Sequence, residues 1–499
     1  MNRGRQLKLN TLAGLLSQVV SFICGFIVPK LILNYYGSEV NGLVSSIAHF
    51  LSFISLAECG MGVVIQSSLY KPLAEHDDKQ ISRVIVSSER FFRKIGLILS
   101  AYVILLFFIY PFLAETSFDT WYTVILIGAI SISTFVQYFI CISYRLLLTA
   151  DQKGYIQLLL NIVAQILNTI LCVILAKCGC SIQLLKLSAS AIMLLQAMLL
   201  ALYVKKHYNI DRKVQITGEP IKQKWNGVAQ HIAFVVLENT PTVVLTMFAT
   251  MASVSVYNVY HLVVNGIKGI VHSAVAGMQS LLGNMYAKQE KEALDQAFSY
   301  YEWAIHLVVV FLYTCTAILI VPFVQIYTDG VTDANYVYPL FGVMISMGQM
   351  LYCLRLPYNA MIFASGHYKE TQNGAFIEAA INVVASVVLV VRFGLIGVAI
   401  GTFLAMTYRT VHLVMYLRKH ILMRPAKHFI KHVVIDVAVI GLSLLATSSI
   451  ELGSPTYLSW IIMALKIALI VGAIVISANI LLYMDLFRVA VKKVLKKHR

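Results

Sequence analysis

Four basic residues interrupt long apolar stretches of the sequence. Arg145 lies in CISYRLLLTADQKGY (141–155), Arg355 opens RLPYNAMIFASGHYK (355–369), Lys268 lies in NGIKGIVHS, and Lys30 follows a proline. A charge in hydrocarbon costs at least ~2.5–3.5 kcal/mol on insertion scales, so such residues mark function or pairing. Guanidinium and ammonium groups bind anions, and the forked guanidinium suits phosphate. We therefore predict that these four residues contact an anionic substrate.

Three acids lie in equally apolar surroundings: Glu58, Glu238 and Glu378. Each could bind a coupling cation, H⁺ or Na⁺, or form an ion pair with one of the basic residues. Pro241 follows Glu238 closely, and a helix broken there would free carbonyl oxygens for an ion. The residue types leave coupling and pairing as open alternatives.

Other charged residues fit simpler roles. Three basic residues lie nearer the ends of apolar stretches, where long side chains snorkel to the headgroups: Lys186, Arg409 and Lys466. Two outer-loop carboxylates in YTDGVTDANY are too few for a calcium site. No phosphate-binding loop, H-E-x-x-H or G-x-S-x-G motif occurs in the sequence. We therefore expect no enzyme, no catalytic residue, no metal site and no cofactor beyond a coupling H⁺ or Na⁺.

The elements that position these residues are membrane-spanning helices. The chain has 499 residues, of which 59% are hydrophobic and 12% charged, whereas soluble domains are about 25% charged. Its apolar blocks have the length that a helix needs to cross a bilayer. The predicted spans are near 9–33, 40–69, 95–114, 122–148, 155–177, 184–204, 228–251, 254–286, 302–327, 337–364, 371–393, 395–417, 432–449 and 458–483. The sequence thus predicts an all-α polytopic membrane protein with about 14 transmembrane helices.

The net charge of +16 is distributed unevenly among the connections. Lys and Arg concentrate in the N-terminal tail, in the segments 71–94, 205–224 and 418–431, and in the tail KKVLKKHR, whereas the alternate loops hold almost none. This asymmetry follows the positive-inside rule and predicts that both termini are cytoplasmic. The basic segments are expected to contact anionic lipids. No reader motif accompanies the charge, so nucleic-acid binding is not expected.

The chain also repeats itself. A shift of 214 residues aligns Tyr122 with Tyr336 and Tyr144 with Tyr358, and a shift one residue smaller aligns Glu89 with Glu302. We predict an N-terminal six-helix bundle (1–204), a cytoplasmic linker (205–227), a C-terminal six-helix bundle (228–417), and two appended helices with a basic tail (418–499). Two pseudo-symmetric bundles around a central cleft suit alternating access.

The repeat relates two of the basic residues. Arg355 aligns with Cys141, and Arg145 follows Cys141 by one helical turn, so both arginines occupy the same face of equivalent helices. We predict that Arg145 receives the anion at the cytoplasmic opening and that Arg355 holds it deeper in the cleft.

The opening stretch LNTLAGLLSQVVSFICGFIVPKLILNYYGSEVNGLVSSI, with Gly37 in a short turn and Gly42-Leu43 entering the second span, resembles bacterial polysaccharide flippases. LLTADQKGY (147–155) resembles the same family. These Wzx-like O-antigen and capsule transporters belong to the multidrug/oligosaccharidyl-lipid/polysaccharide exporter (MOP) superfamily. The resemblance implies transport of an undecaprenyl-pyrophosphate-linked oligosaccharide from the cytoplasmic to the outer leaflet of the bacterial inner membrane.

The resemblance also implies a partner, the polysaccharide polymerase and export machinery. Two alternatives stay open, the first of them within the same superfamily. One is an ion-coupled exporter of drugs or other small molecules, which would favour an acidic cleft and usually has twelve spans. The other is a flippase for peptidoglycan precursors. A polymerase or ligase is disfavoured because the sequence has no large outer loop.

Overall fold

The computed structural model describes residues 3–58, 60–114, 117–214, 228–275 and 278–488. Residues 215–227 of the predicted linker and the basic tail KKVLKKHR (492–499) lie outside these ranges. The described residues form helices and connecting loops without a strand, which confirms the predicted all-α class. They divide into two compact units, Met1–Val256 with Val331–Ala334, and Tyr257–Gly330 with Asn335–Arg499.

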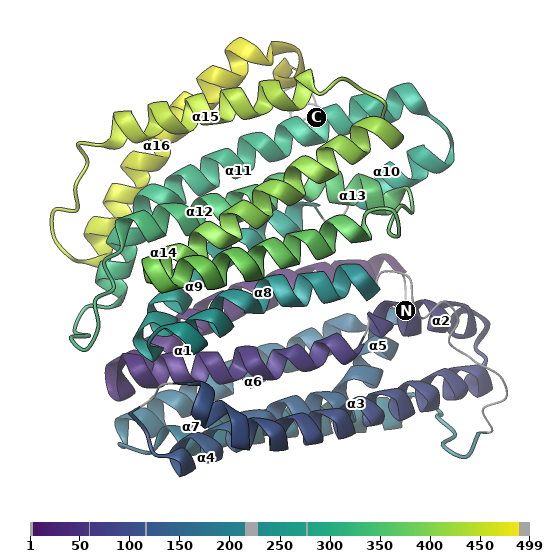
Figure 1. Ribbon diagram of the computed structural model, residues 1–499. Helices are drawn as coiled ribbons and strands as arrows, with labels where there is room; N and C mark the ends of the chain where they lie inside the picture. Colours follow the sequence, from purple (N-terminus) through teal and green to yellow (C-terminus); the bar gives the residue numbers. More distant parts are fainter. Residues whose placement is uncertain (1–2, 59, 115–116, 215–227, 276–277, 489–499) are drawn as a thin grey trace. The chain divides into compact units, whose positions relative to one another are not determined.

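The first unit consists of ten helical elements and the start of α9. These are α1 (Arg3–Ser52), the 3-10 helix η1 (Phe53–Glu58), α2 (Met61–Glu75), α3 (Asp78–Leu113), α4 (Thr120–Val136), the π-helix η2 (Gln137–Cys141), α5 (Ile142–Ala150), α6 (Gly154–Lys177), α7 (Ile182–His207), α8 (Val228–Phe248), and the first residues of α9 (Met251–Val275). Helix α1 lies along α6, and α4 lies along α7 (Figure 1). Their core is aliphatic and includes Leu43, Ile65, Leu99, Leu126 and Leu147.

Helix α1 is broken in the middle, at the glycine that the sequence places in a turn. Gly37 has φ 85° and ψ 173°, a conformation that side chains disfavour. The second half then starts at Ser38, whose backbone N–H donates to Asp333 Oδ2 at 2.6 Å and whose hydroxyl donates to Oδ1 at 2.7 Å. Asp333 therefore caps this half-helix, which explains why Val331–Ala334 belong to the first unit.

The second unit continues with α9 and adds seven helices. These are α10 (Met278–Ala287), α11 (Lys291–Tyr327), α12 (Pro339–Leu354), α13 (Leu356–Ala364), α14 (Gln372–His420), α15 (Lys427–Thr447) and α16 (Tyr457–Leu482). Helix α14 is broken at Gly394, with φ 52° and ψ −127°. The predicted spans 371–393 and 395–417 meet at that residue.

The two helices predicted as appended, α15 and α16, pack against α11. Figure 1 shows all three running along one side of the unit. Val310 and Leu319 of α11 meet Val439 of α15 and Ile467 and Val471 of α16 in a separate apolar core. The appended pair is thus part of the second unit rather than a loose extension.

Eleven helices of the described chain are long and apolar enough to cross a membrane. Helix α14 contains two predicted spans, 371–393 and 395–417. The predicted span 9–33 lies in α1, the span 40–69 continues from α1 into η1 and α2, and α9 with α10 covers the described part of the span 254–286. These segments together match the predicted set of spans. The boundary between the two units falls within α9, so that α8 belongs to the first unit, whereas the repeat predicts a boundary at 205–227. The repeat-based division stays a prediction, because equivalence in sequence and packing in space are different properties.

Candidate functional site

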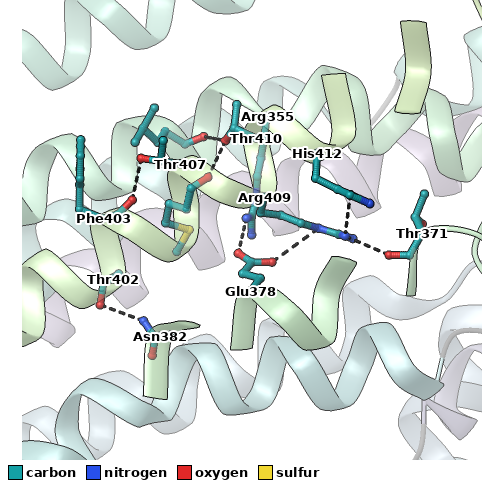
Figure 2. A network of polar contacts seen from close by, with 12 residues as sticks. Arg355, Thr371, Glu378, Asn382, Thr402, Phe403, Thr407, Arg409, Thr410 and His412 are labelled. Atoms are coloured by element: carbon teal, nitrogen blue, oxygen red, sulfur yellow. Dashed lines mark hydrogen bonds and ion pairs between the residues drawn. The ribbon is translucent and has the colours of Figure 1, made fainter. Parts of the chain in front are cut away.

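The second unit contains a buried basic cluster, formed by Lys268, Tyr352, Arg355, Glu378 and Arg409. Lys268 comes from α9, Tyr352 from α12, and Glu378 and Arg409 from the two halves of α14. Three of its members, Lys268, Arg355 and Glu378, were predicted as site residues from the sequence. Figure 2 shows Arg355 and Arg409 approaching the Glu378 carboxylate from separate segments.

Arg355 occupies the junction between α12 and α13. Pro357 has no N–H to donate to the preceding turn, so the helical hydrogen-bond ladder is interrupted here. Arg355 still donates its own N–H to Leu351 O at 3.2 Å. The side chain is 5% exposed. A helix junction midway along the predicted span therefore holds a guanidinium deep within the unit.

Glu378 bridges two guanidinium groups. Arg355 Nη1 donates to its Oε1, and Arg409 Nε lies 3.5 Å from its Oε2. The Glu378 side chain is 6% exposed, and that of Arg409 is 3% exposed. Arg409 Nη1 also donates to the carbonyl oxygen of Thr371 at 2.9 Å. Of the two alternatives left open for Glu378, cation coupling and ion pairing, the structure shows ion pairing.

The remaining cation of the cluster shares an aromatic ring with Arg355. Lys268 Nζ lies 4.2 Å from the Tyr352 ring centroid, and Arg355 Cζ lies 4.6 Å from it. A ring face attracts both cations but carries no net charge. The cluster as defined holds three positive charges and one negative charge. Within the described chain, Arg355 Nε is buried without a hydrogen-bond partner. This arrangement suits the binding of an anion.

Arg409 was expected to snorkel to the headgroups, and that expectation is wrong. Its guanidinium is buried because Gly374, one turn before Glu378, has no side chain to fill the space. A methyl group at Gly374 would lie 2.7 Å from Arg409 Nη1. Nothing in the sequence signals this arrangement, because Arg409 lies 31 positions after Glu378.

The predicted residues of the first unit lie in different places. Arg145 is half-buried in α5, and Lys30 is half-buried in α1. Glu58, at the end of η1, accepts a hydrogen bond from the Tyr138 hydroxyl of η2. Glu58, Tyr138 and Lys186 line a cavity of about 410 Å³. The joint role predicted for Arg145 and Arg355 stays a prediction, because they belong to separate units.

Glu238 is half-buried in α8. The break expected after it does not occur, because α8 continues through Pro241 to Phe248. The Asn239 amide donates to Val235 O at 2.8 Å, and its Oδ1 accepts from the Ser52 hydroxyl at 2.6 Å. Pro241 offers no N–H to the Leu237 carbonyl, but the helix does not open there, so the broken segment on which the ion site was predicted does not occur in α8.

Neither a family model nor a curated protein matches the chain by sequence. Solved structures do match its fold. The lipid II flippase MurJ in an inward closed conformation superposes with a TM-score of 0.72 at 15% identity, over 96% of this chain and 99% of MurJ. An inward-facing multidrug resistance MATE family transporter of the MOP superfamily gives 0.62 at 15% identity, over 80% of this chain and 94% of the transporter. An outward-facing MATE structure gives 0.54 at 15% identity, over 83% and 94%. The chain is thus a multi-pass membrane protein with the fold that these transporters share.

Proposed function

We propose that the protein flips an undecaprenyl-pyrophosphate-linked oligosaccharide from the cytoplasmic to the outer leaflet of the bacterial inner membrane by alternating access. The substrate would be a repeat unit of capsule, O-antigen or exopolysaccharide. The observation that carries the proposal is the buried basic cluster inside a membrane fold, in which Glu378 bridges Arg355 and Arg409 while Lys268 shares the Tyr352 ring with Arg355.

The chemistry of a pyrophosphate fits this cluster. Moving a polyvalent anion through a layer of low dielectric constant requires compensating charge, because an unpaired ion pays several kcal/mol or more of desolvation. Arg355 offers the unsatisfied Nε beside an Nη1 already engaged by Glu378. A phosphate oxygen could accept from Nε, and the Lys268 ammonium on the same aromatic ring would add a second positive charge.

The length of the match favours a lipid-linked substrate over a small drug. MurJ covers 96% of the chain, whereas the inward-facing MATE transporter covers 80%. A basic cluster would also repel cationic drugs, which argues against the drug-exporter alternative. The MurJ match supports one second candidate, a flippase for a lipid-linked peptidoglycan precursor, which carries the same pyrophosphate.

Deletion of the gene distinguishes these candidates. We expect an undecaprenyl-pyrophosphate-linked repeat unit to accumulate on the inner leaflet, whereas accumulation of a peptidoglycan precursor would identify the second candidate. Unchanged levels of both lipids would contradict the proposal. Complementation with Arg355→Gln or Lys268→Gln should restore little export at normal protein levels. Lys466→Gln, which removes an exposed lysine on α16, is the matched control and should restore export fully.

The remaining expectations follow from this function. A polysaccharide polymerase or export complex would receive the flipped lipid. The basic segments and both termini would face the cytoplasmic leaflet and its anionic lipids. Coupling would use H⁺ or Na⁺ and an intramembrane acid, for which Glu58 and Glu238 are proposed, whereas Glu378 is bound by two arginines.

A further inference from the structure

A second polar cluster lies within the helices α11, α15 and α16 of the second unit. We call it the histidine cluster and define it as His306, His432, Asp436 and Tyr483. His306 Nδ1 lies 2.6 Å from Asp436 Oδ2. The His306 and His432 rings stack with centroids 4.7 Å apart, and the Tyr483 hydroxyl lies 2.8 Å from His432 Nδ1. The four side chains thus lie in a row from α11 to the end of α16, with a polar contact at each end and stacked histidine rings between them.

The side chains of the histidine cluster are buried, so a proton is the ligand that fits between them. His306 and His432 are buried, and the Asp436 side chain is 13% exposed. An ionised carboxylate in such surroundings is costly unless it is paired. His306 and Asp436 balance each other when they share one proton, whether as an ion pair or as two neutral groups. Loss of that proton leaves one buried negative charge.

A small cavity adjoins the histidine cluster. It measures about 10 Å³ and is lined by His306, His432, Asp436 and Tyr483 together with Trp303 and Asn479. This space is on the order of one water molecule. His306 Nε2 is buried there and has no hydrogen-bond partner within the described chain. A water in the cavity would link this nitrogen to its polar lining.

The two neighbouring charged groups, Glu302 and Lys431, already have partners. Glu302, one turn before His306 on α11, is bound by Arg424 and accepts a hydrogen bond from the Tyr358 hydroxyl of α13 at 2.5 Å. On the other side, Lys431 of α15 lies with its Nζ 4.3 Å from the Tyr483 ring centroid. The charge of the His306–Asp436 pair is therefore the one that a proton can change without breaking another ion pair.

We propose that the histidine cluster is a proton-binding site, and that proton uptake there is coupled to movement of α15 and α16 against α11. The coupling rests on the proposed function, whereas the proton site does not. Protons would enter past Tyr483 and His432 and settle between His306 and Asp436. When His306 of α11 and Asp436 of α15 share the proton, their contact holds the two helices together. Loss of the proton weakens that contact. Stacked rings cannot turn their nitrogens toward one metal ion, and no metal-binding group of His, Cys, Asp or Glu occurs among the described residues.

The site can be tested on the purified full-length protein without any substrate. Trp303 lines the same cavity and donates its indole N–H to Asn479 Oδ1 at 2.7 Å. With Trp121, Trp225 and Trp460 replaced by Phe, its fluorescence reports on the charge beside it, because a protonated imidazole quenches indole emission. We expect a one-proton transition between about pH 4 and 9, the range around the ordinary histidine value. Absence of a transition overturns the proposal.

Variants assign the transition. His306→Gln should abolish it, and Asp436→Asn, which keeps the shape of the side chain, should weaken proton binding at least tenfold. His207→Gln, which changes an exposed histidine at the end of α7, is the control and should leave the titration unchanged. Circular dichroism checks that each variant folds. A titration in Asp436→Asn or His306→Gln that matches the parent overturns the assignment.

Transport then tests the coupling separately. Flipping measured in vesicles at several pH values should lose its pH dependence in His306→Gln. An unchanged pH profile in that variant, together with a lost fluorescence transition, overturns the coupling and retains the site. A parent protein that flips neither a polysaccharide repeat unit nor a peptidoglycan precursor overturns both the proposed function and the coupling, whereas the titration still decides whether the proton site exists.

Discussion

Glu378→Gln tests whether the buried basic cluster has the electrostatics that its geometry implies. The substitution keeps the volume of the side chain but removes the negative charge between Arg355 and Arg409. Removing one partner of a buried ion pair costs about 3–5 kcal/mol, because the remaining charge stays desolvated. Two guanidiniums share this carboxylate, so we expect a loss in the upper part of that range.

The assay is chemical or thermal unfolding of the purified protein in a fixed detergent. Glu75→Gln is the matched control, because Glu75 is an exposed acid 3.8 Å from Lys71 on α2. An exposed pair contributes about 0–1 kcal/mol, so this control should unfold almost like the parent. Equal stability of the two variants would refute the buried-charge reasoning for Glu378.

A double-mutant cycle then identifies the partner that depends on Glu378. Arg409→Gln in the Glu378→Gln background removes one uncompensated charge, and we expect it to recover part of the lost stability. Coupling energies for residues in contact are about 0.5–3 kcal/mol. Additive losses for Arg409 and Glu378 would show that the 3.5 Å pair carries no coupling.

Three further predictions concern the framework around the site. Gly42→Ala should cost about 1–3 kcal/mol of stability in a detergent unfolding assay, because the added methyl group would overlap the carbonyl of Met251. Asp333→Ala should cost about 0.5–2 kcal/mol in the same assay, since it uncaps the second half of α1. Burial and the hydrogen bond to Asp151 raise the pKa of Tyr208, so its contribution to stability is present below about pH 10 and is lost as the pH rises above it. Tyr208→Phe should therefore show a shallower stability loss than the parent between about pH 9 and 12, and parallel curves would contradict this.

The sequence predicts the helices well because their causes are local. Apolar blocks of bilayer length place the spans, and Gly37 and Gly394 mark breaks, because glycine adopts positive φ without strain. Lys268 and Arg355 could be predicted as buried charges for the same reason, since the apolar residues around them are neighbours in the chain.

The partners of these residues could not be predicted. Glu378 and Arg409 lie 31 positions apart, on either side of the Gly394 break, and only the packing of α14 on itself joins them. His306 and Asp436 are 130 positions apart. The helix break expected at Pro241 does not occur, and α8 continues to Phe248 although proline offers no N–H to the Leu237 carbonyl. The periodicity of hydrophobic residues along the sequence carries no information on such contacts, or on whether packing keeps a helix intact at a proline.

The internal repeat also includes a set of polar contacts made by a residue that follows the last span of each half. Each predicted half of the repeat joins a glutamate, a tyrosine and an arginine that follows its sixth span: Glu89, Tyr144 and Arg212 in the first half, and Glu302, Tyr358 and Arg424 in the second. Arg212 Nη2 donates to the Tyr144 hydroxyl at 2.8 Å and lies 3.8 Å from Glu89 Oε1. Two of these three positions were already aligned by the sequence shift, and the arginine completes the equivalence.

The appended helices change what the second triad can do. The Arg212 side chain is 65% exposed, whereas that of Arg424 is 12% exposed. Phe429 of α15 packs edge-on against Tyr358, with centroids 5.9 Å apart, and this helix helps to shield the second triad from water. A solvent-screened ion pair contributes little, but the same pair in a dry environment resists separation. Helix α15 thus shields the ion pair of Glu302 and Arg424. Because Glu302 is held in this pair, the neighbouring His306–Asp436 pair is the proposed place where the second unit gains or loses a proton.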